Sequence, residues 1–167
     1  MILPTFLRTI EASGLSVWLR ESPSLLAYPA FLAAHTIGMA FLAGPNVAID
    51  LRILGVAPRL PLAPLERFFG LMWLGFAVNL VSGVVLLVAY PTKALTDPVF
   101  YVKLGFVVLA VMYMQMIRNR VFRALPAGDL LVTKGKFLAV ASLICWAGAI
   151  TAGKFMEYTY HYLVYPS

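Results

Sequence analysis

The sequence is poor in charged residues. Only 12% of its 167 residues are Asp, Glu, Lys or Arg, whereas 62% are hydrophobic, and the mean hydropathy is +0.88. Soluble globular domains carry about 25% charged residues. The composition therefore excludes a water-soluble globular domain and predicts an integral membrane protein.

Cysteine and histidine are also scarce, with one cysteine, Cys145, and two histidines in the chain. A single cysteine excludes an intrachain disulfide framework and a paired-cysteine metal site. The sequence has no phosphate-binding glycine loop, no Ser-His-Asp set, and no paired-carboxylate or HExxH metal motif. Hydrolase and ATPase functions have no support, and no catalytic residue is predicted.

The net charge is +6, but the basic residues stand at the ends of apolar segments and not along one amphipathic face. Lysine and arginine in such positions meet the anionic headgroups of lipids. The expected partner is therefore membrane lipid, and nucleic acid is not expected.

Four apolar segments are long enough to cross the ~30 Å hydrocarbon core of a bilayer at about 1.5 Å per residue. We expect these spans at residues 24–49, 68–90, 98–118 and 137–155. Residues 1–23 mix apolar and charged positions and predict an amphipathic helix in the membrane interface, or alternatively a soluble cap, broken at Gly14. The predicted fold is all-α, with a four-helix transmembrane bundle over residues 24–167 preceded by this interfacial helix.

Several residues predict where the spans begin and end. Asp50 and Arg52 are expected to close the first span sharply, and Asp97 followed by Pro98 is a typical start for the third. Three prolines within residues 58–64 predict a stiff, extended loop without regular secondary structure.

The distribution of lysine and arginine predicts the orientation. The loops after the first and third spans carry more of these residues than the opposite side, and such loops face the cytoplasm. We therefore expect a multi-pass protein of the bacterial inner membrane with both termini in the periplasm.

His35 is an ionisable side chain near the middle of the first span, with Gly38 leaving space beside it. A polar group at that depth is a candidate for a functional site. On the predicted topology Lys103 lies about 8 to 9 Å nearer the outer surface, similar to the distance from a haem iron to its propionates. We expect His35 to bind the metal of haem b and Lys103 to pair a propionate, with Lys154 and Arg20 near the same rim.

Other interpretations of these residues remain open. His35 can hydrogen-bond a backbone carbonyl or Asn79, and Lys103 can extend to the interface without a partner. The spans contain no second histidine, so Met112 or Met39 would have to supply another axial ligand, although such methionines usually serve packing. A five-coordinate iron is equally compatible with the sequence.

Three stretches carry a family resemblance: AHTIGMAFLAG in the first span, VKLGFVVLAVMYMQ in the third, and SLICWAGAITAGKFMEY in the fourth. The chain resembles a bacterial four-helix membrane family related in outline to copper-resistance D-type domains and HemJ-type protoporphyrinogen oxidases. In the HemJ-type proteins a first-span histidine binds haem b and a lysine opens the third span, and His35 and Lys103 fall at those positions.

The resemblance therefore implies haem ligation by His35. The chain departs from that family in lacking its second histidine, and Lys154 stands where nearer relatives tend to have arginine. The oxidase activity is not carried over, and whether the chain is an enzyme stays open.

These observations predict a small b-type haem-binding inner-membrane protein or subunit that takes part in electron transfer or haem-linked redox chemistry. The alternative is a non-catalytic structural or assembly subunit of a larger membrane complex. That alternative would use the glycines of the second span, such as Gly75, for close helix packing. Other membrane subunits or a second copy of the chain are the partners expected in addition to lipid.

Overall fold

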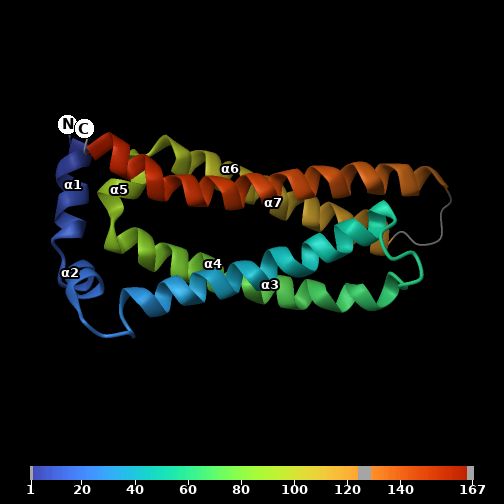
Figure 1. The fold of residues 1–167 in the computed structure, drawn as a ribbon, viewed down its shortest axis with the longest axis horizontal. Coiled ribbons are helices and arrows are strands. Elements are labelled where there is room, and N and C mark those ends of the chain that lie inside the picture. Colours follow the sequence, from blue (N-terminus) through green and yellow to red (C-terminus); the bar gives the residue numbers. More distant parts are fainter. Residues whose placement is uncertain (1, 124–128, 165–167) are drawn as a thin grey trace.

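The computed structural model describes residues 2–123 and 129–164, and its regular elements are all helices. Four long helices run side by side in Figure 1, namely α3 (Tyr28–Leu54), α4 (Phe68–Ala89), α6 (Pro98–Ile117) and α7 (Asp129–Val164). Each of the four contains a segment long and apolar enough to cross a membrane. The prediction of an all-α, four-helix membrane fold is confirmed.

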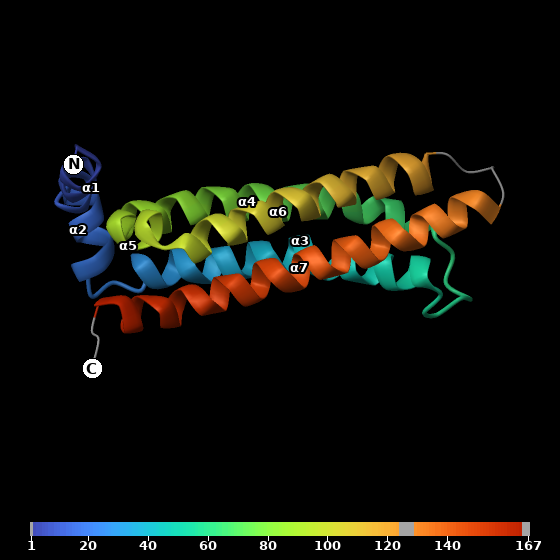
Figure 2. The same cartoon turned by 90° about the horizontal axis from the view of Figure 1, so that it is seen from above.

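Short helices mark the two ends of the bundle. The cap end, as we call it, carries α1 (Ile2–Glu11), α2 (Gly14–Glu21) and α5 (Pro91–Thr96). Figures 1 and 2 show α1 and α2 lying across the ends of the long helices. The opposite end, the loop end, carries the 3-10 helix η1 (Ala63–Arg67) and the π-helical turn η2 (Arg118–Phe122).

Helix α2 is fastened to the end of α4 by hydrogen bonds. Arg20 Nη1 donates to the Ala89 carbonyl oxygen over 2.8 Å, and Ser16 Oγ donates to the same oxygen over 3.2 Å. The last carbonyls of a helix lack intrahelical partners and attract cations, so these contacts complete the end of α4. The second guanidinium nitrogen, Nη2, donates to the Glu11 carbonyl. Arg20, which we expected near a cofactor rim, is instead engaged in the cap.

Asp50 and Arg52, at which we expected the first span to close, do not end the helix. Helix α3 continues to Leu54 and ends at Gly55, which adopts a left-handed conformation with φ of 103°. The Val56 N–H donates to the Leu51 carbonyl in the closing turn. A glycine in this conformation ends many helices, because it tolerates positive φ without steric cost. Asp50 therefore lies inside the helix and not at its boundary.

Other boundaries also differ from the sequence-based ones. Helix α3 begins at Tyr28 rather than at residue 24. Helix α7 covers Asp129–Val164 and extends beyond both ends of the span expected at residues 137–155, which agrees with its membrane-length apolar part, Gly135–Met156. The proline-containing loop was expected to lack regular structure, but η1 forms within it. Arg52 holds this loop through donation to the carbonyls of Pro58 and Leu60.

Helices α3 and α4 approach each other most closely at two glycines. A Cβ atom placed on Gly38 would lie 2.8 Å from the Asn79 backbone nitrogen, and one placed on Gly75 would lie 2.8 Å from both the Gly38 oxygen and the Leu42 nitrogen. Neither position has room for a larger residue, because the obstacles are backbone atoms. Gly75, which we considered for contact with a partner subunit, is used to pack α3 of the same chain.

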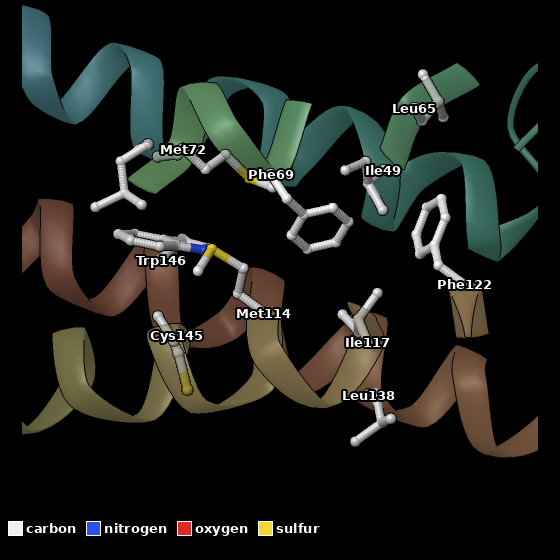
Figure 3. Close-up of a cluster of buried hydrophobic side chains, with 13 residues drawn as sticks. Ile49, Leu65, Phe69, Met72, Met114, Ile117, Phe122, Leu138, Cys145 and Trp146 are labelled. Atoms are coloured by element: carbon white, nitrogen blue, oxygen red, sulfur yellow. The ribbon is translucent and has the colours of Figure 1, made fainter. Parts of the chain in front are cut away.

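Large apolar side chains fill the loop-end half of the bundle. Figure 3 shows Phe69 and Met72 from α4 facing Trp146 and Met114 from α7 and α6. All four side chains are at most 1% exposed. Nearer the loop end, the Phe69 and Phe122 rings meet edge to face with centroids 5.3 Å apart. Burial of these side chains joins the α3–α4 pair to the α6–α7 pair.

Candidate functional site

His35 lies on α3 in the cap-end half of the bundle, where its half-buried ring is held against α4. Ring atom Nδ1 is 3.0 Å from the backbone oxygen of Asn79 and 3.2 Å from Ser82 Oγ. The Asn79 side chain returns the contact, donating from Nδ2 to the His35 carbonyl over 2.8 Å. Two helices thus exchange hydrogen bonds at one level.

These contacts identify the nitrogen that carries the proton in neutral His35. A backbone carbonyl only accepts hydrogen bonds, so Nδ1 must donate to Asn79. Ser82 Oγ donates to the Val78 carbonyl over 2.6 Å, which leaves an oxygen lone pair toward Nδ1. The lone pair of the neutral ring is therefore on Nε2. Metal-binding histidines are commonly oriented in this way, by donation from the other ring nitrogen to a carbonyl.

A glycine on α4 allows the ring to lie close to that helix. A Cβ atom on Gly83 would be only 3.1 Å from His35 Cε1, which is tighter than an ordinary contact between such atoms. Gly83 is one of the glycines of the second span, which we expected to allow close helix packing. In the structure it accommodates the imidazole.

Lys103 approaches the same region from α6. Its half-buried side chain runs along Gly153 of α7, where an added Cβ atom would lie 3.7 Å from Lys103 Cε and 3.8 Å from Nζ. Lys103 is thus a cation of the same interior region as His35. The structure therefore brings together two of the three residues that the sequence singled out, one from each helix pair.

The depth difference predicted between His35 and Lys103 depends on where their two helices begin. Because α3 begins at Tyr28, His35 is seven residues into its helix, and Lys103 is five residues into α6. At 1.5 Å per residue His35 lies about 10 Å and Lys103 about 8 Å from the first residue of its own helix. The predicted depth difference of about 8 to 9 Å counts His35 from residue 24.

Lys154 follows Gly153 on α7, and its side chain is exposed. Met112 is 54% exposed and lies on the outer surface of α6, so it is not a second ligand opposite His35. Met39 is half-buried and packs against the core cluster one turn along α3. Among the side chains that the structure describes, no group of three or more His, Cys, Asp or Glu residues is arranged to hold a metal ion.

A surface pocket of about 470 Å³ lies between α6 and α7, away from His35. Its walls are mainly apolar and include Met112, Tyr113 and Phe137, with Arg120 among the lining residues. On a membrane-spanning surface such a pocket faces lipid tails. It adds no chemical group to the His35 region.

A second polar cluster, which was not predicted from the sequence, lies in the loop-end half of the bundle. Asn46 Nδ2 on α3 donates over 2.8 Å to Asp50 Oδ2 and over 2.8 Å to Ser142 Oγ on α7. The exposed fractions of these side chains are 2% for Asn46 and 0% for both Asp50 and Ser142. The spacing of four residues between Asn46 and Asp50 was the available signal, because it places both on one face of a helix.

Comparison of the chain with family models, with curated proteins and with solved structures found no match.

Proposed function

We propose that this chain is a small b-type haem-binding membrane protein or subunit in which His35 is the axial ligand of the iron. The observation that carries the proposal is the fixed orientation of the His35 ring, with Nδ1 donating to the Asn79 carbonyl. This arrangement leaves the Nε2 lone pair for a metal, and imidazole is a usual ligand of haem iron. The haem would supply one-electron redox chemistry.

Residues of the chain would position the haem and pair the negative charge of its propionates. Donation from Nδ1 to Asn79 fixes the ring and increases the basicity of Nε2. Lys103 supplies a positive charge in the same interior region, suited to a propionate, and Lys154 is a second, exposed cation. The surrounding bundle is apolar, which would limit the access of water to the iron. Electron transfer or haem-linked redox chemistry is the role these features support.

The resemblance to HemJ-type proteins and copper-resistance D-type domains supports the same two assignments, His35 and Lys103. It also agrees with a location in the bacterial inner membrane. The loop end carries a concentration of basic residues, namely Arg52, Arg59, Arg67, Arg118, Arg120, Arg123 and Lys136. By the positive-inside rule we place the loop end in the cytoplasm and the cap end, with both termini, in the periplasm.

The alternative proposal is a structural or assembly subunit of a larger membrane complex. Gly75 cannot serve it directly, since α3 covers that residue. Gly44, Gly70 and Gly105 favour it, because added Cβ atoms at these positions would meet nothing within 4 Å. Another membrane subunit or a second copy of the chain would approach at such surfaces.

An absorption spectrum of the purified protein tests the proposal. Protein expressed with sufficient haem should show a Soret band, and His35→Ala should abolish it while the helical content, measured by circular dichroism, is retained. The helices are set by their apolar length and not by a cofactor. Purified wild-type protein without Soret absorbance would overturn the haem proposal and leave the subunit role as the better one.

A further inference from the structure

The Asn46, Asp50 and Ser142 cluster contains a carboxyl group that is fully enclosed. Asp50 is 0% exposed although it lies only four residues before the end of α3. Its Oδ2 accepts a hydrogen bond from Asn46, whereas its Oδ1 has no hydrogen-bond partner among the described residues. Oδ1 is therefore enclosed from bulk solvent and has no hydrogen-bond donor among the described protein groups.

The cations near this end of the bundle make no hydrogen bond with Asp50 among the described residues, and the buried Nε of Arg118 has no hydrogen-bond partner there either. On α3 itself, Arg52 donates to the loop carbonyls of Pro58 and Leu60. On η2, the Arg118 guanidinium lies over the Phe69 ring, 5.5 Å from its centroid. On η1, Arg67 and Glu66 are exposed.

The helices packed against α3 add no charge to the Asp50 site. Helix α7 contributes the neutral Ser142 and, one turn farther along, Trp146, while α4 contributes Phe69 and Met72 to the adjoining core. Figure 3 shows Ile49, the neighbour of Asp50, within this apolar cluster, with Leu65 and Phe122 beside it toward the loop end. In the described part of the chain, no hydrogen bond or ion pair joins Asp50 to a cation.

An ionised carboxylate in this position would be a buried charge without a counter-ion, which is among the most costly arrangements in a protein. A neutral carboxylic acid avoids that cost and keeps the hydrogen bond from Asn46. A hard metal ion is a poor alternative, since it requires six or more oxygen ligands and the cluster offers one carboxylate. The Asn46 amide nitrogen, a donor, also occupies the space between the two oxygens it contacts.

We propose that Asp50 is a proton-binding site inside the membrane, kept as the neutral carboxylic acid by its complete burial without a counter-ion in the α3–α7 interface, where Asn46 donates to its Oδ2. The ligand is a single proton. It exchanges with the aqueous phase at the loop end, which is about one helical turn away. The site is distinct from His35, which lies fifteen positions earlier on α3 (residues 35 to 50), about 22 Å along the helix at 1.5 Å per residue.

Infrared spectroscopy of the purified protein at pH 7 tests this proposal. Exposed Asp and Glu side chains are ionised there, because they titrate near pH 4, so a carboxylic acid C=O band would report a buried acid. We expect a band that shifts in D₂O, shifts again when the protein is labelled with carboxyl-¹³C aspartate, and disappears in Asp50→Asn. The aspartate label identifies the residue type in the wild-type protein, so that the test does not depend on the folding of one variant.

Asp97 provides a matched control. It is also buried, with 5% exposure, but both of its oxygens are satisfied: Oδ1 accepts from the Val99 N–H over 2.8 Å and Oδ2 from Thr159 Oγ1 over 2.7 Å. We expect Asp97→Asn to keep the acid band. Absence of the band in wild-type protein at pH 7, or its loss in Asp97→Asn and persistence in Asp50→Asn, would overturn the proposal. Sodium-dependent loss of the band would likewise overturn it in favour of a cation site.

Discussion

Each half of the bundle contains a notable polar side chain, His35 or Asp50, and the surroundings of these two side chains differ. Near the cap end, His35 is half-buried, one ring nitrogen is fixed by a carbonyl, and Lys103 is a cation of the same interior region. Near the loop end, Asp50 is fully buried and its oxygen Oδ1 has no partner among the described residues. The first arrangement suits a group that binds a ligand through a free lone pair, whereas the second suits a group that is neutralised by a proton.

The α3–α4 contact supports both sites, and breaking it should have the largest effect. Gly75→Leu would drive a side chain into the backbone of α3, because even a Cβ atom would lie 2.8 Å from the Gly38 oxygen. We expect a loss of stability of at least about 1–3 kcal/mol, or failure to fold. Thermal unfolding in detergent, followed by circular dichroism, would measure it.

Gly70→Leu is the matched control on the same helix, since a Cβ atom there meets nothing within 4 Å. Its unfolding midpoint should remain close to that of the wild type. Equal effects of the two substitutions would contradict the close approach of α3 and α4 as the structure shows it.

The second-largest effect is expected for substitution of Lys103. Lys103→Met keeps the length and apolar stem of the side chain but removes the charge beside His35. If Lys103 pairs a propionate, haem should be retained roughly 10- to 150-fold less tightly, since a charge-assisted hydrogen bond contributes about 1.5–3 kcal/mol. Transfer of haem from the protein to apomyoglobin would measure the change.

Lys136→Met is a suitable comparison, because Lys136 is exposed near the start of the last span and far along α7 from Gly153. This variant should transfer haem at the wild-type rate. Faster transfer from Lys136→Met than from Lys103→Met would show that the interior lysine has no part in retention.

The smallest effect is expected from Asp50→Asn. If Asp50 is already neutral, replacing its acid by an amide keeps the shape and the charge of the site. The free energy of unfolding should then change by less than about 1 kcal/mol, within the range of substitutions that break no charged contact. Chemical denaturation in mixed micelles would measure it.

Asp50→Leu is the corresponding comparison. It leaves Asn46 Nδ2 with Ser142 Oγ as its remaining acceptor, so it should cost more than the asparagine variant. A loss of 3–5 kcal/mol in Asp50→Asn itself would instead match the breaking of a buried ion pair and contradict a neutral Asp50.

The four helices could be predicted from the sequence because apolar length alone determines a membrane span. His35 could be singled out for the same reason, since a polar residue in the middle of an apolar segment is conspicuous. Its contact with the Asn79 carbonyl decides which nitrogen is free, and that depends on how α3 and α4 pair around Gly38 and Gly75.

Asp50 could not be interpreted from the sequence. A carboxylate near the end of an apolar run fits a span boundary as well as an interior position. The choice was decided by Gly55, which ends the helix one turn later, and by Ser142 on α7, whose hydroxyl meets Asn46 from a position 96 residues away in the chain. A contact between residues so far apart in the chain cannot be predicted from the local pattern of apolar residues.

Haem binding by His35→Asn tests the central claim most directly. The asparagine amide can donate to the Asn79 carbonyl much as Nδ1 does, but it offers no nitrogen lone pair at the position of Nε2. We predict that this variant keeps the wild-type unfolding midpoint and loses the Soret band completely. A variant that retains the wild-type Soret band would contradict the claim, because His35 would then serve only as a hydrogen-bonded residue of the α3–α4 interface.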